Sequence, residues 1–406
     1  MALFSTIKVS NRSRSVDPGP GVGPRAGEAE RMGMDIGVPT ETKADERRVA
    51  LTPAAVGELA SRGHRVTLQS GAGCGAGFGD RLYKEAGAQI AGSAAEVFDT
   101  AELVVKVKEP RADERAMLRP DHTLFTYLHL AADRAQTDDL LASGATCVAY
   151  ETVTDEDGRL PLLTPMSAIA GRMSIQAGAR CLEAPQGGTG VLLGGVPGVR
   201  PGRVVVIGGG VVGRNAAEMA VGLGAEVTVL DREPKILDAL DQRFDSRIRT
   251  VFSTTADLEA EVLEADLLVG AVLLPGARAP RLVTAAMVAE MRAGSVIVDV
   301  AIDQGGCVET SRPTTHSDPT FLVDGVVHYC VANMPGAVPR TATLALANAT
   351  LGYVSTLADR GVEAALLSDP HLLAGLNVCA GRICEPAVAK TFGLEVTDPL
   401  EALAAR

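Results

Sequence analysis

One segment near the middle of the chain constrains its fold more than any other. An apolar, β-branched run at 203–207 meets a G-x-G-x-x-G turn at Gly208, Gly210 and Gly213, and a helical pattern follows. A second apolar run then begins and stops at Asp231. Two strands joined by a helix, with the glycine turn at the start of that helix, are typical of a dinucleotide-binding βαβ unit.

Each part of this segment suits one part of a dinucleotide. Gly208 permits the tight turn, Gly210 lets the backbone approach a pyrophosphate, and Gly213 lets the helix pack closely on the strand. The helix N-terminus offers N–H groups and a positive dipole end to the phosphates. Asp231 stands where a carboxylate accepts hydrogen bonds from ribose hydroxyls. A glycine turn in another kind of α/β protein would not explain Asp231, so the segment predicts a dinucleotide site.

Length and composition favour two doubly wound, Rossmann-type α/β domains. A chain of 406 residues is too long for one ordinary core. It has no Trp and is rich in Ala, Val, Gly and Leu, as expected of parallel sheets covered by helices of small residues. The net charge of −12 argues against nucleic acid or an anionic membrane as partner. No apolar run approaches the ~18–20 residues that span a bilayer.

The seven cysteines are scattered, with no C-x-x-C pair and no cluster of His and Cys. An odd, dispersed set in a long α/β chain predicts reduced thiols and a cytoplasmic protein. We expect no metal site, because metal-ligand spacing is absent from the sequence.

The first residues differ from the rest. Residues 1–33 are crowded with Ser, Arg, Gly and Pro and show no apolar period. We expect a disordered leader, or a start codon placed upstream of the true start at Met32 or Met34. A transit peptide is a weaker alternative, because acidic residues interrupt the stretch.

Two series of alternating strands and helices predict the domain organisation. A helix over 166–182 is expected to link them, and a long Ala/Leu helix over 341–357 is expected to return to the first. We therefore predict a discontinuous substrate domain of residues 34–161 plus 340–406. Residues 162–339 would form the NAD-binding domain, with an active-site cleft between the two.

Four polar side chains stand near the ends of apolar runs, where ligands bind in open α/β sheets. Lys108 and His129 each end a run, Asp303 follows the run 295–302, and Arg48 lies in a polar loop after the first run. Together they offer an Arg for bidentate contact with a carboxylate and a Lys to polarise a carbonyl. The His and the Asp could move protons.

Taken singly, each of these residues has a simpler explanation. His129 between two leucines suits a core histidine, and Lys108 suits a strand-end charge paired with Glu109. Asp303 suits a helix cap or turn, and Arg48 a solvated surface position. Their joint placement at strand ends is what favours a site.

The motifs around these residues resemble those of alanine dehydrogenases, colinearly from Met34 to about residue 400. The NAD-binding subunit of proton-translocating transhydrogenase is the nearest related family, and saccharopine-type lysine dehydrogenases are more distant. The matching stretches are Gly37–Lys43, Arg48–Pro53, Lys106–Pro110, Leu128–Ala132, Pro165–Ser167, Gly194–Gly198, Asp299–Gly306 and Val331–Pro335.

The resemblance implies a homohexamer that carries out NAD-dependent, reversible oxidative deamination of L-alanine to pyruvate and ammonia. Arg48 would hold the substrate carboxylate and Lys108 the carbonyl or amine region. His129 would be the catalytic acid/base, with Asp303 assisting proton transfer and the placement of water or ammonia. Positions expected to contact the cofactor are Ser167, Gly208, Gly210, Gly213, Asp231 and Asn333.

Two positions depart from the expected pattern or leave a choice open. Ala168 stands where many relatives have an acidic residue, so a hydrogen bond near the cofactor is expected to be missing. Arg232 leaves some room for NADP, although Asp231 should repel a 2′-phosphate. Two other functions stay open: a hydride-passing subunit of a transhydrogenase, and a dehydrogenase for another small 2-amino or 2-oxo acid.

Overall fold

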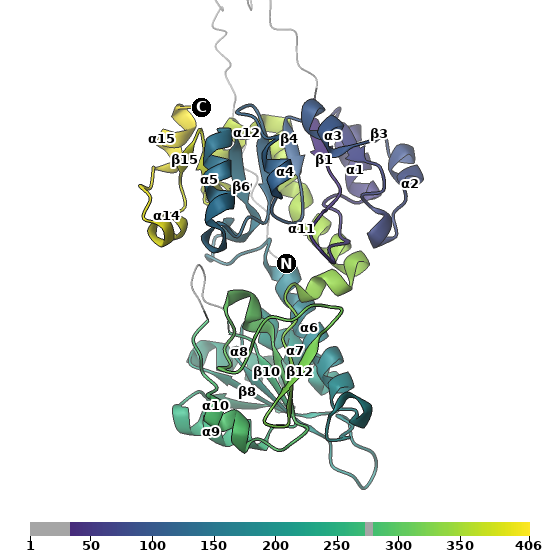
Figure 1. Ribbon diagram of the computed structural model, residues 1–406, viewed down its shortest axis with the longest axis vertical. Helices are drawn as coiled ribbons and strands as arrows, with labels where there is room; N and C mark the ends of the chain where they lie inside the picture. Colours follow the sequence, from purple (N-terminus) through teal and green to yellow (C-terminus); the bar gives the residue numbers. More distant parts are fainter. Residues whose placement is uncertain (1–32, 273–278) are drawn as a thin grey trace, which may run out of the picture. The chain divides into compact units, whose positions relative to one another are not determined.

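The structure, a computed structural model, describes residues 33–272 and 279–406. The predicted leader therefore lies outside the described residues, apart from Gly33. The described chain forms two separate sheets, each built from parallel strands with helices on its faces (Figure 1). No helix within this part of the chain is long and apolar enough to cross a membrane.

The first sheet has eight strands in the order β15-β14-β6-β5-β4-β1-β2-β3. The strands β1 to β6 are parallel and follow the doubly wound order 3-2-1-4-5-6, whereas β14 and β15 join antiparallel beyond β6. The strands are β1 (Asp35–Val38), β2 (Arg65–Gln69), β3 (Gln89–Ala91), β4 (Leu103–Val105), β5 (Thr123–Thr126), β6 (Thr146–Ala149), β14 (Leu376–Cys379) and β15 (Arg382–Ile383).

Alternation along the strands places a separate core on each face of this sheet. In β4, Leu103 and Val105 pack with residues of α1 and α11, whereas Val104 packs with Phe98 of α3 and Leu140 of α5. The helices of this part are α1 (Pro53–Ser61), α2 (Asp80–Glu85), α3 (Ala94–Thr100), α4 (Ala112–Arg115), α5 (Arg134–Ser143), α11 (Pro339–Arg360), α12 (Val362–Ser368), α13 (Pro370–Leu373), α14 (Pro386–Phe392) and α15 (Pro399–Ala404).

The second sheet has the order β12-β13-β11-β10-β7-β8-β9. Its six parallel strands again follow the Rossmann order, and β12 adds an antiparallel edge to β13. The elements are β7 (Arg203–Ile207), β8 (Glu226–Asp231), β9 (Arg249–Phe252), β10 (Leu267–Gly270), β11 (Val296–Asp299), β12 (Thr320–Val323), β13 (Val326–Tyr329), α6 (Thr164–Cys181), α7 (Val211–Gly222), α8 (Pro234–Phe244), α9 (Thr255–Glu264) and α10 (Ala285–Glu290).

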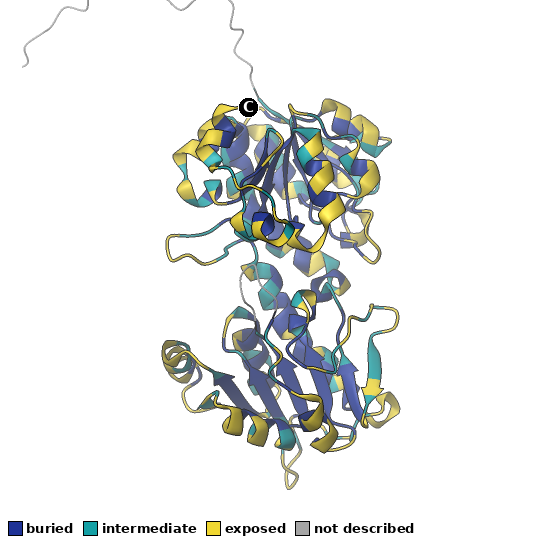
Figure 2. Cartoon of the chain, turned by 60° about the vertical axis from the view of Figure 1, so that its left-hand side comes forward, coloured by how far each residue is buried: buried dark blue, intermediate teal, exposed yellow. Residues whose placement is uncertain are grey.

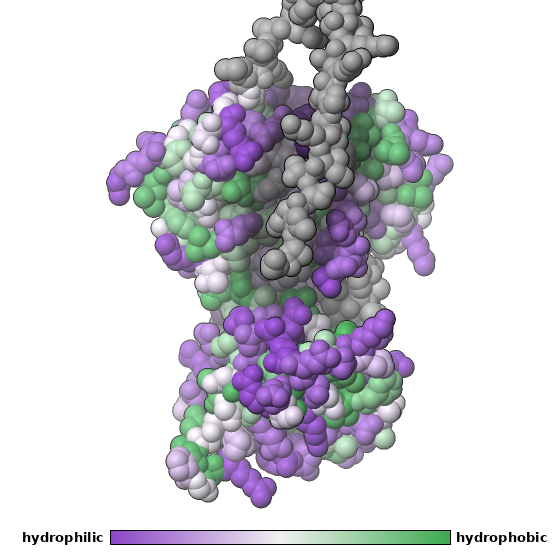
Figure 3. Space-filling view, turned by 180° about the vertical axis from the view of Figure 1, so that it is seen from behind, coloured by the Kyte–Doolittle hydropathy of each residue, from purple (hydrophilic) through white to green (hydrophobic). Residues whose placement is uncertain are grey.

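Short 3₁₀ helices occupy several loops, most of which follow strands. They are η1 (Cys74–Ala76), η2 (Leu130–Ala132), η3 (Tyr150–Thr152), η4 (Ala184–Gln186), η5 (Val300–Gln304) and η6 (Met334–Ala337). In Figure 2 most strands of both sheets are buried, whereas the edge strands β9 and β12 and the outward sides of the helices are more exposed. On the side shown in Figure 3, hydrophilic and apolar surfaces are interspersed over the described residues.

The predicted helices over 166–182 and 341–357 are present as α6 and α11, which begin two residues earlier than expected. Both begin with Pro at the first or second position, where its fixed φ suits a helix and its missing N–H costs nothing. Helix α6 contacts α7 of the second sheet and also α11, which packs on the first.

Candidate functional site

The glycine turn between β7 and α7 has the geometry that its three glycines predict. Gly208 has φ +100°, a left-handed conformation that favours glycine. A Cβ on Gly213 would lie 1.8 Å from the carbonyl oxygen of Gly208, so helix and strand approach too closely for any side chain there. A Cβ on Gly210 would meet nothing within 4 Å. The backbone at Gly210 is therefore open to a ligand at the N-terminus of α7.

Asp231, the last residue of β8, is hydrogen-bonded to this turn. Its Oδ2 accepts a hydrogen bond from the N–H of Gly209 at 2.6 Å, and its Oδ1 accepts one from Glu233 at 2.9 Å. These bonds fix the carboxylate beside the glycine turn, and each oxygen keeps a second lone pair for a ribose hydroxyl.

Arg48 is 2% exposed, so it is not the solvated surface residue of the simpler explanation. Glu46 holds it in a fork, with Nε to Oε1 at 2.6 Å and Nη2 to Oε2 at 2.5 Å. Nη2 also donates to Oδ1 of Asn333 at 2.8 Å. Among the residues that the structure describes, Nη1 has only a sulfur partner, Sδ of Met166 at 3.0 Å. A bidentate contact with a substrate would therefore compete with Glu46, whereas Nη1 is the nitrogen with donor capacity left.

Glu46 is ionised by this arrangement despite its burial. Burial would raise its pKa, but the hydrogen bonds and charge of Arg48, together with Asn333, lower the pKa of Glu46 to about 2. A buried guanidinium and a buried carboxylate thus stabilise each other in the folded chain.

Asn333 connects residues that are far apart in the sequence. It has φ +59°, a left-handed conformation that Asn tolerates better than most residues. Its side chain donates to Oε2 of Glu46 at 3.0 Å, and its backbone N–H donates to Oδ1 of Asp303 at 3.2 Å. The predicted cofactor residue therefore touches both a predicted substrate residue, Arg48, and a predicted proton-transfer residue, Asp303.

Lys108 is half-buried, and its ammonium makes no hydrogen bond or ion pair within the described residues. The simpler explanation is a pair with Glu109, which forms an ion pair with Lys43 and also acts electrostatically on Lys108. Burial lowers the pKa of Lys108; Glu109 opposes this change, whereas Arg48 adds to it. An unpaired, partly desolvated ammonium is available to a ligand.

His129 lies three residues beyond β5 rather than at its last position. It has φ +51°, and its N–H donates to Oε1 of Glu151 at 2.5 Å. The imidazole stacks on Tyr127 with 5.8 Å between ring centroids, and 44% of the side chain is exposed, so it is not a core histidine. Desolvation lowers its pKa; Glu151, whose Oε1 is 3.9 Å from Nδ1, opposes this change and Lys108 adds to it.

Asp303 is exposed and belongs to η5, because β11 ends at Asp299. The expected strand over 295–302 is therefore too long by three residues at its end. The carboxylate of Asp303 acts electrostatically on both Lys108 and His129, so the structure brings these three groups together. Ser167 lies half-buried in the first turn of α6, next to Met166, the sulfur partner of Arg48.

Sequence reasoning missed Glu46, Glu151 and Met166. The strand-end rule could have found Glu151, which follows β6 by two residues. Glu46 lies two residues before Arg48 in the same polar loop, but nothing local indicates that their side chains pair.

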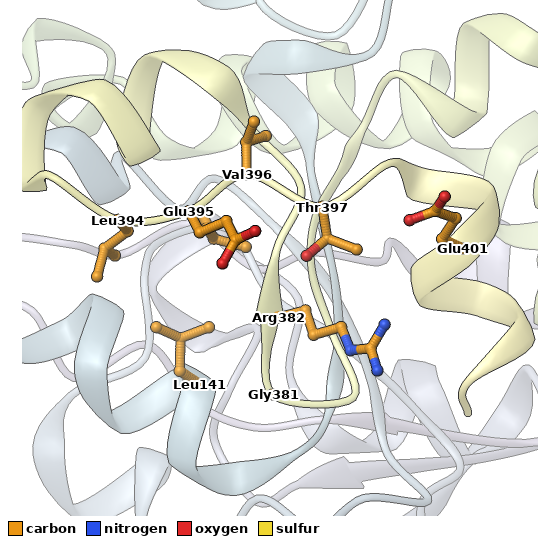
Figure 4. Close-up of a pocket in the computed structure, with 9 residues that line it drawn as sticks. Leu141, Gly381, Arg382, Leu394, Glu395, Val396, Thr397 and Glu401 are labelled. Atoms are coloured by element: carbon orange, nitrogen blue, oxygen red, sulfur yellow. The ribbon is translucent and has the colours of Figure 1, made fainter.

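A shallow pocket lies elsewhere, where β15 faces Leu141 of α5, the segment 394–397 and Glu401 of α15 (Figure 4). It contains none of the predicted site residues. Across 33–272 and 279–406, no group of three or more His, Cys, Asp or Glu side chains is placed to hold a metal ion.

Comparison with known proteins gives the family. Models described as the N-terminal and C-terminal domains of alanine dehydrogenase/PNT match residues 37–170 and 174–386. The chain is 60% identical over 365 residues to the alanine dehydrogenase of Halomonas elongata, which covers 90% of this chain and 98% of that protein. This chain belongs to the alanine dehydrogenase family.

Other relatives agree with this membership. The alanine dehydrogenase of Bacillus subtilis is 54% identical over 371 residues, covering 91% of this chain and 98% of that protein. A solved L-alanine dehydrogenase superposes with a TM-score of 0.86 at 57% identity, covering 89% of this chain and 99% of the other. A transhydrogenase from Sinorhizobium meliloti superposes with a TM-score of 0.73 at 25% identity, covering 87% of this chain and 99% of the other. The two-domain α/β class predicted from the sequence is confirmed.

Proposed function

We propose that the protein catalyses the NAD-dependent, reversible oxidative deamination of L-alanine to pyruvate and ammonia. Family membership supports this reaction. The observation that carries it to this chain's residues is that Asp303 acts electrostatically on Lys108 and His129, and Lys108 acts on His129, although the three residues come from separate loops. A cation, an ionisable imidazole and a carboxylate are the groups that a carbonyl–amine interconversion requires.

NAD is the hydride acceptor in this proposal, and NADH the donor in the reverse direction. The open backbone at Gly210 and the N-terminus of α7 suit its pyrophosphate. The carboxylate of Asp231 suits the ribose hydroxyls, and its negative charge disfavours the 2′-phosphate of NADP despite the neighbouring Arg232. Ser167 and Asn333 complete the proposed contacts.

The substrate carboxylate is assigned to Nη1 of Arg48, and the carbonyl or amine region to Lys108. Among the described residues, Nη1 of Arg48 donates only to the sulfur of Met166, and Nζ of Lys108 has no hydrogen-bond partner. Both observations support these assignments. A carboxylate held by the buried Arg48 and a carbonyl polarised by the half-buried Lys108 are oriented for reaction and partly shielded from water.

The low pKa of His129 keeps the imidazole neutral near pH 7, which suits a general base. In the deamination direction it takes a proton from the water that attacks iminopyruvate, and it returns that proton to the departing ammonia. Asp303 assists the transfer and the placement of water or ammonia. In the amination direction the same groups act in reverse order.

The test follows the absorbance of NADH with pyruvate and ammonium. Oxidation that requires both, and that reverses with L-alanine and NAD, is the expected result. Oxidation without ammonium would instead identify a 2-oxo-acid reductase. Hydride exchange between two nucleotides in the absence of alanine would identify a transhydrogenase subunit. Replacing NADH by NADPH tests the role of Asp231, and much weaker activity is expected.

The same proposal includes a cytoplasmic homohexamer and the division into 34–161 plus 340–406 and 162–339. Exposed apolar side chains on one loop and the nearby Leu223 support association of copies, and the seven free cysteines suit a reducing compartment. Sedimentation velocity tests the hexamer, with a single species six times the chain mass expected. The exposed loop side chains are Leu192, Val196 and Val199.

A further inference from the structure

The segment that carries Lys108 continues past the end of β4 with a strand neighbour on one side only. Towards β5 it is held by Tyr127, whose N–H donates to the carbonyl of Val107 at 3.3 Å, and by Thr126, whose hydroxyl donates to the carbonyl of Lys108 at 3.0 Å. On the other side, the pairing of β1 with β4 stops at Val104. The N–H groups of Val107 and Lys108 therefore have no strand to donate to on that side.

A single carboxylate takes the place of the missing strand. Oε1 of Glu41 accepts from the N–H of Val107 at 2.7 Å, and Oε2 accepts from the N–H of Lys108 at 3.3 Å. Glu41 is buried and follows β1 by three residues. Its two oxygens thus hold two consecutive peptide groups at the point where the chain presents Lys108.

Glu41 keeps its place through a buried cation. Nζ of Lys106 lies 3.4 Å from Oε2 of Glu41 and 2.7 Å from Oε1 of Glu114. The other oxygen of Glu114 accepts from the N–H of Arg111 at 2.8 Å, just before α4. Burial raises the pKa of Glu41, and the charge of Lys106 and the N–H of Val107 oppose this rise.

We propose that Glu41 is a positioning residue for substrate binding: it sets the direction of Lys108 by holding the two peptide N–H groups that precede the Lys108 side chain. This inference rests on the proposed function, because it takes Lys108 to be a substrate ligand. In this proposal Glu41 contacts neither substrate nor cofactor, and it acts on Lys108 through the backbone.

The test is Glu41→Gln in the full-length enzyme. The amide has one acceptor oxygen, and its NH₂ group cannot accept from a peptide N–H. One of the two peptide N–H groups, that of Val107 or that of Lys108, then loses its acceptor. We expect the KM for pyruvate to rise at least about 10-fold, while kcat changes less than about threefold and the dissociation constant of NADH is unchanged. A folded variant with an unchanged KM for pyruvate overturns the proposal.

Glu114→Gln is the matched control. It removes charge from the other partner of Lys106 but leaves both bonds of Glu41 to the backbone. We expect a lower melting temperature with the KM for pyruvate within about twofold of the wild type. An equal rise in KM for both variants would mean that the buried charge, rather than the backbone contact, matters, and would overturn the proposal.

Lys108→Ala separates failure of this inference from failure of the proposed function. Pyruvate binding to the enzyme–NADH complex is measured by calorimetry without ammonium. Unchanged binding would remove Lys108 from the substrate site and the proposal with it. If Lys108→Ala weakens binding, adding Glu41→Gln should weaken it no further, because Glu41 acts through Lys108. Additive losses would overturn the positioning role.

Hydrogen exchange of the wild-type protein keeps the inference testable if Glu41→Gln does not fold. The amides of Val107 and Lys108 should exchange as slowly as those of β4, because the carboxylate serves as their strand partner. Exchange at the rate of an exposed loop would overturn the proposal.

Discussion

Nη2 of Arg48 donates to Oδ1 of Asn333 across 2.8 Å and 285 positions of sequence. One of these residues is proposed to bind the substrate and the other the cofactor. Glu46 also accepts a hydrogen bond from Asn333. A change at Asn333 should therefore alter the position of Arg48. The two proposed binding sites are therefore linked by direct hydrogen bonds.

Asn333→Gly tests this link. Glycine accepts the left-handed backbone at this position but removes both side-chain hydrogen bonds. A bond between a neutral and a charged group is worth about 1.5–3 kcal/mol, so we expect the KM for pyruvate to rise about 10-fold or more. Binding of NADH should weaken as well. Steady-state kinetics and NADH fluorescence titration measure the two effects, and an unchanged KM for pyruvate would contradict the link.

Glu46→Gln should destabilise the protein in a way that depends on pH. A folded-state pKa of about 2 against an ordinary value of 4.5 corresponds to about 3 kcal/mol of stability. Because the folded pKa is depressed, this stability is present above about pH 4.5 and is lost as the pH falls towards 2. Urea unfolding of both proteins from pH 7 downwards measures the difference. A constant difference across that range would refute the ionised state of Glu46.

His129 should control the acid side of the pH profile. Because its pKa is lowered by desolvation, kcat/KM for L-alanine should fall only below pH 6.5, as the base becomes protonated. The charge of Glu151 raises the pKa of His129, so Glu151→Gln should move the acid-side fall in kcat/KM to lower pH. His129→Ala should abolish turnover while leaving NADH binding largely intact. A shift to higher pH in Glu151→Gln would show that another group is titrating.

Gly213→Ala should damage the dinucleotide site. The added Cβ meets the carbonyl of Gly208 at 1.8 Å, so the start of α7 must shift. We expect a loss of about 1–3 kcal/mol in unfolding free energy and much weaker NADH binding. Gly222→Ala, at the other end of the same helix, is the control, because its Cβ would meet nothing within 4 Å. That change should be neutral or gain up to about 1 kcal/mol from helix propensity. Equal effects of the two changes would exclude the steric explanation.

Much of the fold follows from patterns that are local in the sequence. The run 203–207, the three glycines and Asp231 predict a strand, a turn and a helix because each depends on residues close in the chain, and the structure contains all of them. Element ends were less predictable. The apolar run before Asp303 continues past β11 because Ala301 and Ile302 are buried in a 3₁₀ helix, which periodicity does not distinguish from a strand.

The sequence by itself determined the two βα series, the dinucleotide turn and the residue types that a carbonyl–amine reaction needs. Tertiary structure alone decided which of these residues have partners. It joined Glu46 to Arg48 and Asn333, and it placed the carboxylate of Glu41 against the backbone N–H of Lys108. Within 33–272 and 279–406, it gave the ammonium of Lys108 no hydrogen bond. It also added β14 and β15 to the first sheet. Such contacts join positions far apart in the chain, so they depend on the packed path of the backbone, which local periodicity does not encode.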